Sequence, residues 1–178
     1  MLYAFGFERV GVVVSDLYFL DPDPDPGQEG AERGVRLEVR ILARGELKGS
    51  IYSAQPVVVD RPIWRADLLE SLDAPGSFDR THHHPAFDGW EPGCRQFVEA
   101  LSADPLAWVA ATLGDLDTLL DQAGVDAVEV DPSDGANLRL AVPEIIDAVR
   151  RLLDRVRAGE LARPPVEGGL SSARVGWL

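Results

Sequence analysis

The sequence contains one cysteine, one lysine and no apolar run long enough to cross a membrane. Because Cys94 has no second cysteine to pair with, an internal disulfide is excluded, and the chain is compatible with a reducing compartment. A transmembrane helix needs about 18 or more apolar residues in a row, and no such stretch occurs. The first residues also lack the basic and then apolar order of a secretory signal. We therefore expect a cytoplasmic protein without membrane association.

Basic residues are scarce relative to acidic ones. Lys48 and the arginines total 17 against 30 aspartates and glutamates, which gives a formal net charge of −13. Such a charge disfavours nonspecific binding to nucleic acid, whose phosphates attract lysine and arginine. An acidic surface suits a basic protein partner, or simply keeps the protein in solution.

Sequence motifs with a known chemistry are also missing. The chain has no phosphate-binding loop of the Walker type, no glycine-rich dinucleotide fingerprint and no Gly-x-Ser-x-Gly nucleophile motif. It lacks the paired spacings of specific zinc motifs as well. Cys94 could act as a nucleophile beside a histidine, although a lone cysteine is more often a packing residue.

The N-terminal part has the composition and alternation of β-strands. Apolar residues alternate with charged ones most clearly over 35–41, and aromatic and β-branched residues dominate 1–20. Alternating Asp and Pro over 21–27 predict an exposed loop rather than a calcium site. Together the strands predict an antiparallel meander. They are expected over residues 1–20, 35–41, 50–54, 56–60, 61–72 and 77–82.

The C-terminal part has the spacing of amphipathic helices. Asp104 and Pro105 form a favourable helix start, and the apolar stripe that follows ends at Gly124. A second helix is expected from Pro143 to Gly159.

The expected fold is therefore of the α+β class. An antiparallel sheet in the N-terminal half is packed by two C-terminal amphipathic helices, with a long ordered loop between them. Trp177 would pin a C-terminal tail to the body. Two short strands are expected between the helices, over 125–130 and 137–142. The chain of 178 residues predicts a single domain, mainly β over 1–60, loop-rich and histidine-containing over 61–103, mainly helical over 104–160, with a tail over 161–178.

The most unusual stretch runs over residues 77–97 and holds all three histidines. Pro85 pushes the residue before it toward extended backbone, so the histidine run is expected to be extended. Side chains alternate in an extended chain, which places His82 and His84 on one face and His83 on the other. A long irregular segment inside a compact domain is uncommon and, when ordered, is often functional.

A His-x-His pair on one face can chelate a divalent metal such as zinc, and a carboxylate can complete the ligand set. The carboxylates closest in sequence belong to Asp79, Asp88 and Glu91. The candidate metal ligands are therefore His82, His84 and these three acidic residues.

The same stretch could instead hold an anion. Arg80 and Arg95 are the candidate anion-binding residues, and Trp90 could line the binding surface. Phe78, Phe87, Trp90 and Phe97 are also expected to anchor the segment to the core. In the structural alternative, the histidines cap a loop, with one buried and hydrogen-bonded and two exposed to solvent.

Two functions from different classes fit these patterns. The first is a protein-interaction or regulatory module that uses the acidic surface. The second is a metal- or histidine-dependent enzyme that acts on a small anionic substrate, with its site over residues 79–95. We favour the first because the second lacks a specific motif.

Overall fold

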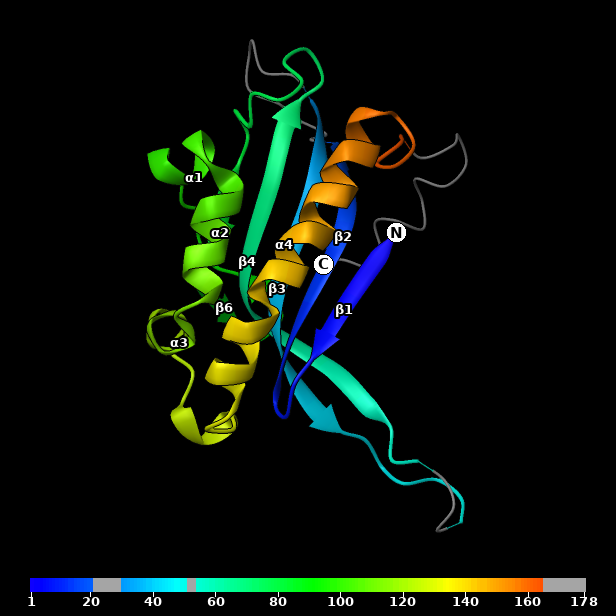
Figure 1. Ribbon diagram of the computed structural model, residues 1–178, viewed down its shortest axis with the longest axis vertical. Helices are drawn as coiled ribbons and strands as arrows, with labels where there is room; N and C mark the ends of the chain where they lie inside the picture. Colours follow the sequence, from blue (N-terminus) through cyan, green and yellow to red (C-terminus); the bar gives the residue numbers. More distant parts are fainter. Residues whose placement is uncertain (21–29, 51–53, 165–178) are drawn as a thin grey trace.

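A computed structural model describes residues 1–20, 30–50 and 54–164. Its main feature is a five-stranded antiparallel sheet in which each strand lies beside the one that precedes it in the chain (Figure 1). The predicted α+β class and the predicted meander are confirmed. The strands are β1 (Leu2–Gly6), β2 (Val10–Leu20), β3 (Ala31–Arg44), β4 (Val57–Ser71) and β5 (His82–His84).

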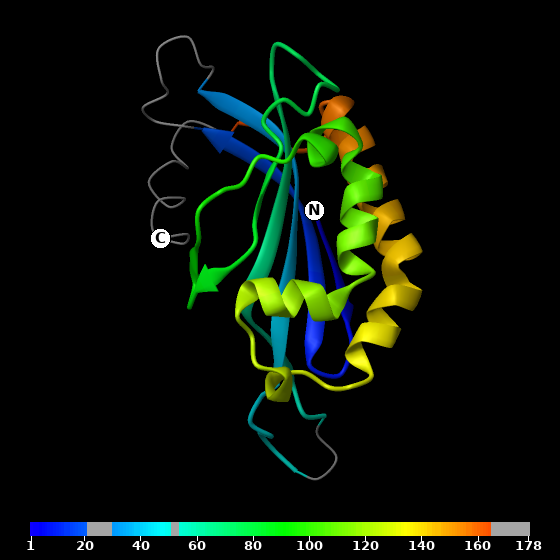
Figure 2. The same ribbon diagram turned by 90° about the vertical axis from the view of Figure 1, so that its left-hand side faces the viewer.

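Helices cover one face of this sheet. They are α1 (Glu99–Ala103), α2 (Pro105–Leu113), α3 (Leu116–Ala123), the short 3-10 helix η1 (Ala127–Glu129) and α4 (Asp134–Arg157). Figure 2 shows α1, α2 and α4 on one side of the sheet and the hairpin of β6 (Phe87–Asp88) and β7 (Glu91–Pro92) on the other. Among the described residues, the sheet therefore has one face covered by helices and an opposite face covered by this hairpin and its flanking segments.

The apolar character of the helix-covered face follows from the alternation in the strands. Val12 of β2 pairs with Val39 of β3, which pairs with Trp64 of β4, and all three are fully buried. Helix α4 packs its apolar stripe onto them, because the period of 3.6 residues brings Ile145, Val149 and similar residues to one side. The residues between these positions point to the opposite face of the sheet, and many of them are charged.

Strand β3 passes very close to β4 at Gly34. A Cβ atom on Gly34 would lie 1.9 Å from the carbonyl oxygen of Leu68. We expect Gly34→Ala to lower the free energy of unfolding by about 2–3 kcal/mol, because the backbone of β4 must move to make room. Gly135→Ala is the matched control, since the nearest atom would be 3.9 Å away. Urea unfolding of both variants tests this, and equal midpoints would contradict the close approach.

Strand β4 is longer than expected and continuous. It runs through residue 60, so the two strands predicted over 56–60 and 61–72 are one element. Pro62 is tolerated inside this strand because the register with β3 shifts around Arg40, and a proline can be accommodated at such a bulge. The strand expected over 77–82 is wrong in its position: β5 starts only at His82 and pairs with Arg65–Asp67.

The two strands predicted between the helices are wrong. Residues 127–129 form η1, and α4 begins at Asp134 and continues through Pro143. The alternation that suggested a strand over 137–142 places Leu138 in the core but leaves Leu140 81% exposed, on another side of the helix. A helix can carry such a pattern because two residues along it turn the side chain by more than half a circle.

The helix expected from Asp104 to Gly124 is two helices. Its start is confirmed, because the Asp104 carboxylate accepts a hydrogen bond from the Ala107 N–H at 3.1 Å. Its end is confirmed at Gly124, which has a left-handed φ of 66°. Between them, α2 ends at Gly114 and Asp115 caps the start of α3, so the chain changes direction there.

Some predictions concern parts of the chain that the structure does not describe. The Asp-Pro loop, the centre of the strand over 50–54 and Trp177 lie in the stretches 21–29, 51–53 and 165–178. Within the described ranges, no helix is both long enough and apolar enough to span a membrane.

Candidate functional site

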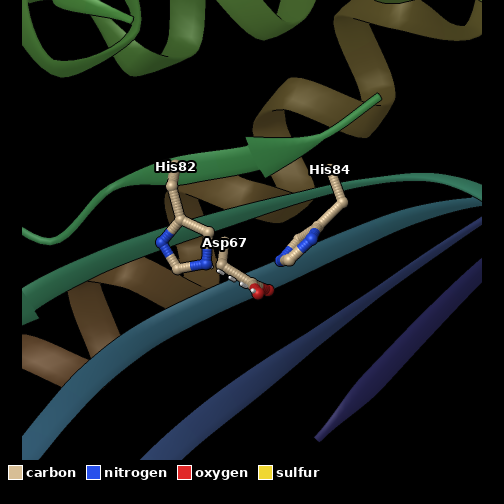
Figure 3. Close-up of side chains that lie close together, drawn as sticks. All are labelled: Asp67, His82 and His84. Carbon is tan, nitrogen blue, oxygen red and sulfur yellow. Dashed lines mark ion pairs between the residues drawn. The ribbon is translucent and has the colours of Figure 1, made fainter. Parts of the chain in front are cut away.

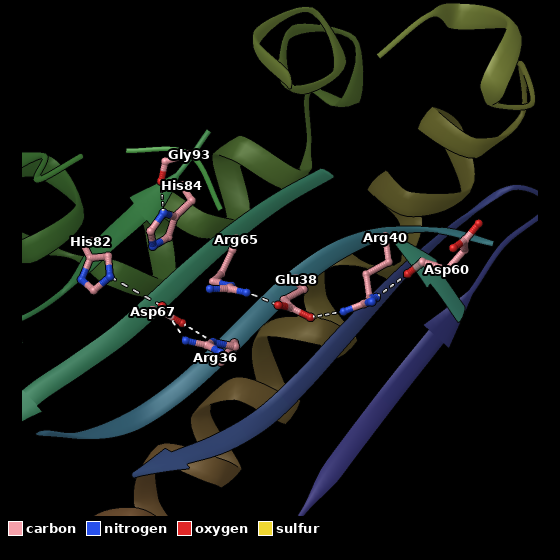
Figure 4. Close-up of polar contacts among 9 residues, drawn as sticks. All are labelled: Arg36, Glu38, Arg40, Asp60, Arg65, Asp67, His82, His84 and Gly93. Carbon is pink, nitrogen blue, oxygen red and sulfur yellow. Dashed lines mark hydrogen bonds and ion pairs between the residues drawn. The ribbon is translucent and has the colours of Figure 1, made fainter. Parts of the chain in front are cut away.

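Charged side chains form two linked groups on the polar face of the sheet (Figure 4). Arg36 of β3 binds Asp67 of β4 through two parallel hydrogen bonds, Nε to Oδ1 at 2.7 Å and Nη2 to Oδ2 at 3.0 Å. Farther along the sheet, Glu38 accepts hydrogen bonds from Arg65 at 3.0 Å and from Arg40 at 2.5 Å. Such charge-assisted pairs hold their members in fixed orientations.

The histidine run adds two imidazoles to this face. His82 of β5 lies opposite Asp67 of β4, and His84 lies opposite Arg65. Their rings are 5.2 Å apart, centroid to centroid. Both point toward the Asp67 carboxylate, as Figure 3 shows. That His82 and His84 share one face is what the alternation of an extended chain predicts.

His83 points to the opposite face and belongs to the core. Its ring centroid lies 4.9 Å from that of Trp108 and 6.2 Å from that of Trp64. Its Nδ1 atom is buried and has no hydrogen-bond partner among the described residues. All three histidines are buried, so the alternative with two solvent-exposed imidazoles does not hold.

Hydrogen bonds determine which nitrogen of each imidazole faces the carboxylate. Nδ1 of His82 lies 2.8 Å from the carbonyl oxygen of Arg80, and Nδ1 of His84 lies 2.7 Å from that of Gly93. Because a carbonyl can only accept, each Nδ1 carries the hydrogen and each Nε2 keeps its lone pair. The Nε2 of His82 lies 3.5 Å from Oδ2 of Asp67. One ligand atom from each of these two histidines and Asp67 lies within 4.8 Å of the others.

The surroundings favour the neutral form of both imidazoles and the charged form of the carboxylate. Burial lowers the pKa of His82 and of His84. The hydrogen bonds to the backbone carbonyls and the charge of Asp67 act in the opposite direction, but the effect of burial is larger. The charge of Arg95 lowers the pKa of His82 further. Burial alone would raise the pKa of Asp67, but the Arg36 guanidinium brings it below its usual range. The neutral imidazole and the ionised carboxylate are the forms that bind metals.

A cleft of about 180 Å³ opens beside these three side chains. Its wall combines arginines with apolar residues. The other lining residues are Leu17, Phe19, Glu32, Arg36, Arg65, Leu69 and Arg95.

The acidic residues predicted as ligands from sequence proximity lie elsewhere. The Asp79 carboxylate accepts hydrogen bonds from the Ser71 N–H at 2.9 Å and from the Ser77 hydroxyl at 2.7 Å. Asp88 and Glu91 are exposed on the β6–β7 hairpin. Within the described residues, the structure groups none of the three with the two imidazoles.

Asp67 is the carboxylate that lies beside the two imidazoles, and the sequence analysis did not predict it. It precedes His82 by 15 positions, and only the pairing of β4 with β5 brings the two together. A signal was present, because a single carboxylate at position 67 interrupts the apolar residues around it and shares a strand face with Arg65. A charge in such a place is expected to be paired.

The predicted anion-binding residues separate in the structure. Arg95 lines the cleft, whereas Arg80 lies within 4.0 Å of Glu32 and 3.8 Å of Asp79. Trp90 lies under the guanidinium of Arg40 at 5.1 Å. It is 60% exposed and Phe97 is 65% exposed, so the prediction that these two anchor the segment to the core is wrong. Phe78, predicted with them, does pack against the core.

The hydrogen bonds of Asp79 make a testable contribution to stability. Burial would raise the pKa of Asp79, but the bonds from Ser71 and Ser77 outweigh it and lower the pKa. The stabilisation is therefore present above the ordinary Asp pKa of about 3.9 and is lost as pH falls through the lower folded-state pKa. We expect wild type to be more stable than Asp79→Asn at pH 7, with the difference shrinking at about pH 3. Urea unfolding at both pH values measures it, and a pH-independent difference would contradict this role.

Comparisons of the chain with models of protein families, with curated proteins and with solved structures found no match. A functional assignment therefore has to start from the chemistry of the groups that line the cleft.

Proposed function

We propose that His82, His84 and Asp67 bind a divalent transition metal, with zinc as the first candidate, and that the protein is a metal-dependent enzyme acting on a small anionic substrate. One observation carries the proposal. Two imidazoles each donate Nδ1–H to a backbone carbonyl and thereby present Nε2 to the same carboxylate. Histidines that bind metals are commonly oriented by such second hydrogen bonds.

The hydrogen bonds from Arg36 to Asp67 are compatible with a metal. A carboxylate has about four lone-pair sites, and Arg36 uses one on each oxygen. Arg36 therefore fixes the carboxylate in place as an outer-shell partner does, and leaves a lone pair for coordination. Each Nε2 also keeps its lone pair. Because the three ligand atoms lie within 4.8 Å of one another, the side chains would move slightly closer together to reach zinc bond lengths of about 2.0–2.2 Å.

Three protein ligands favour a catalytic site over a structural one. Structural zinc is usually held by four protein ligands, whereas catalytic zinc keeps a position for water or substrate. The cleft beside Asp67 provides the space for that position. A zinc ion with such a position lowers the pKa of its bound water and polarises substrate oxygens.

Metal stoichiometry tests the proposal. Untagged protein, stripped with a chelator and then dialysed against zinc, is expected to bind about one equivalent. Circular dichroism of the stripped protein should be unchanged, because ion pairs and carbonyl hydrogen bonds already hold the three side chains. Binding of less than about 0.2 equivalents by a protein that stays folded would contradict the proposal.

A protein-interaction module is the second candidate, and the exposed start of β4 favours it. Residues Val57, Val58 and Val59 are large apolar residues exposed one after another, with Val57 67% exposed. They pair with the end of β3 in a hairpin that projects beyond the body of the sheet (Figure 1). Apolar residues that gather on a surface often mark an interface. A partner that binds wild type but not Val57→Lys would support this role.

A further inference from the structure

We propose that the open position of the metal takes a small carboxylate with a short apolar body, and that Arg95 binds its second oxygen. This inference rests on the proposed function, since the metal at His82, His84 and Asp67 would hold the first oxygen. It names the class of substrate that the cleft selects.

Arg95 is the guanidinium of the cleft that is available to a ligand. Arg36 donates its hydrogen bonds to Asp67. Arg65 donates one to Glu38, and its guanidinium lies over the ring of Phe87. Arg95 lines the same cleft and is exposed, yet it forms no hydrogen bond or ion pair with any residue in the described ranges. A guanidinium binds a carboxylate through parallel N–H donors, so Arg95 is suited to this ligand.

The charge of the cleft favours an anion. Three arginines line it against two carboxylates, Asp67 and Glu32, which leaves one positive charge when the imidazoles are neutral. A divalent metal would raise this to three. The excess is local, because the chain as a whole carries a net charge of −13. A cleft of one sign on a surface of the other sign concentrates ligands of opposite charge within it.

The apolar part of the wall selects a carboxylate over an inorganic oxyanion. Leu17, Phe19 and Leu69 line the cleft together with the charged groups. Phosphate presents oxygens in every direction and would lose hydration against these side chains. A carboxylate with a short hydrocarbon body directs its charge to one end and its apolar surface to the other. The volume of about 180 Å³ limits the ligand to a small molecule.

Butyrate is a suitable probe, and zinc-loaded protein is the form to use. Isothermal titration is expected to show butyrate binding to wild type, with acetate and inorganic phosphate weaker. Arg95→Gln should weaken butyrate binding by about tenfold or more, because a charge-assisted contact is lost. Arg44→Gln is the matched control, since it removes the same charge from an exposed site outside the cleft and should leave butyrate affinity unchanged.

Zinc affinity, measured in parallel, separates the inference from the proposed function. Both variants should bind zinc within about threefold of wild type, because neither residue is a ligand. If zinc binds normally but butyrate affinity is equal in wild type and Arg95→Gln, the carboxylate site is refuted and the metal site stands. If phosphate binds more tightly than butyrate, the carboxylate assignment is wrong. If wild type binds no zinc, both the metal site and the inference fail.

Discussion

Replacement of His82 or His84 by alanine is expected to weaken zinc binding by about 100-fold or more. Loss of an outer-shell partner already costs about 10- to 100-fold in metal affinity, and a ligand contributes more directly than its partner. The change removes one of only three protein ligands. Competition between each variant and a chromogenic chelator of known affinity measures the effect.

His83 provides the matched control from the same strand. His83→Phe keeps an aromatic ring beside Trp108 and removes a buried Nδ1 that has no partner among the described residues. We therefore expect unchanged zinc affinity and equal or higher stability. If all three variants lose zinc equally, the effect comes from damage to β5 rather than from the loss of ligands. If none loses zinc, the metal lies elsewhere.

Replacement of Asp134 by alanine is expected to lower the free energy of unfolding by about 3 kcal/mol or more. The Asp134 side chain is fully buried at the start of α4 and accepts hydrogen bonds from three backbone N–H groups. The Glu8 N–H and Arg9 N–H lie in the turn between β1 and β2, and the third donor is the Asp131 N–H. A hydrogen bond to a charged group contributes about 1.5–3 kcal/mol, and the variant loses three of them. The midpoint of urea unfolding, with the slope checked for constancy, gives the value.

An exposed helix cap gives the comparison for Asp134. Asp115→Ala removes a carboxylate that accepts from the Thr118 N–H at 3.2 Å at the surface, and should cost clearly less stability than Asp134→Ala. Asp134→Asn keeps one acceptor oxygen and should recover part of the loss. Equal losses for Asp134→Ala and Asp115→Ala would show that the buried carboxylate does not tie the β1–β2 turn to α4.

Local patterns were sufficient for much of the fold. Alternation over 35–41 predicts β3 because apolar residues occupy one face of that strand and charged residues the other. In the structure Glu38 and Arg40 on the charged face are also buried, and they pair with each other. The shared face of His82 and His84 could also be predicted locally, because the proline that follows them favours an extended backbone. Capping by Asp104 and the left-handed Gly124 set helix boundaries through contacts within a few residues.

Features that depend on distant contacts could not be predicted in this way. Asp67 joins His82 only through strand pairing, so a search among sequence neighbours selected Asp79, Asp88 and Glu91 instead. The Asp134 carboxylate at the start of helix α4 binds a turn more than 120 residues away. The residues over 137–142 carry no sign of that contact. Their alternation resembles that of a strand, so the start of the helix could not be predicted.

X-ray absorption at the zinc edge of the loaded protein tests the metal site most directly. We predict two nitrogen ligands with the scattering pattern of imidazole and at least one oxygen ligand, all at about 2.0–2.2 Å. The imidazole signal should be lost in the His82→Ala/His84→Ala variant and kept in His83→Phe. A sulfur ligand at about 2.3 Å would place the metal at Cys94, and a shell of oxygens alone would exclude the histidines. Either result would contradict a metal site at His82, His84 and Asp67.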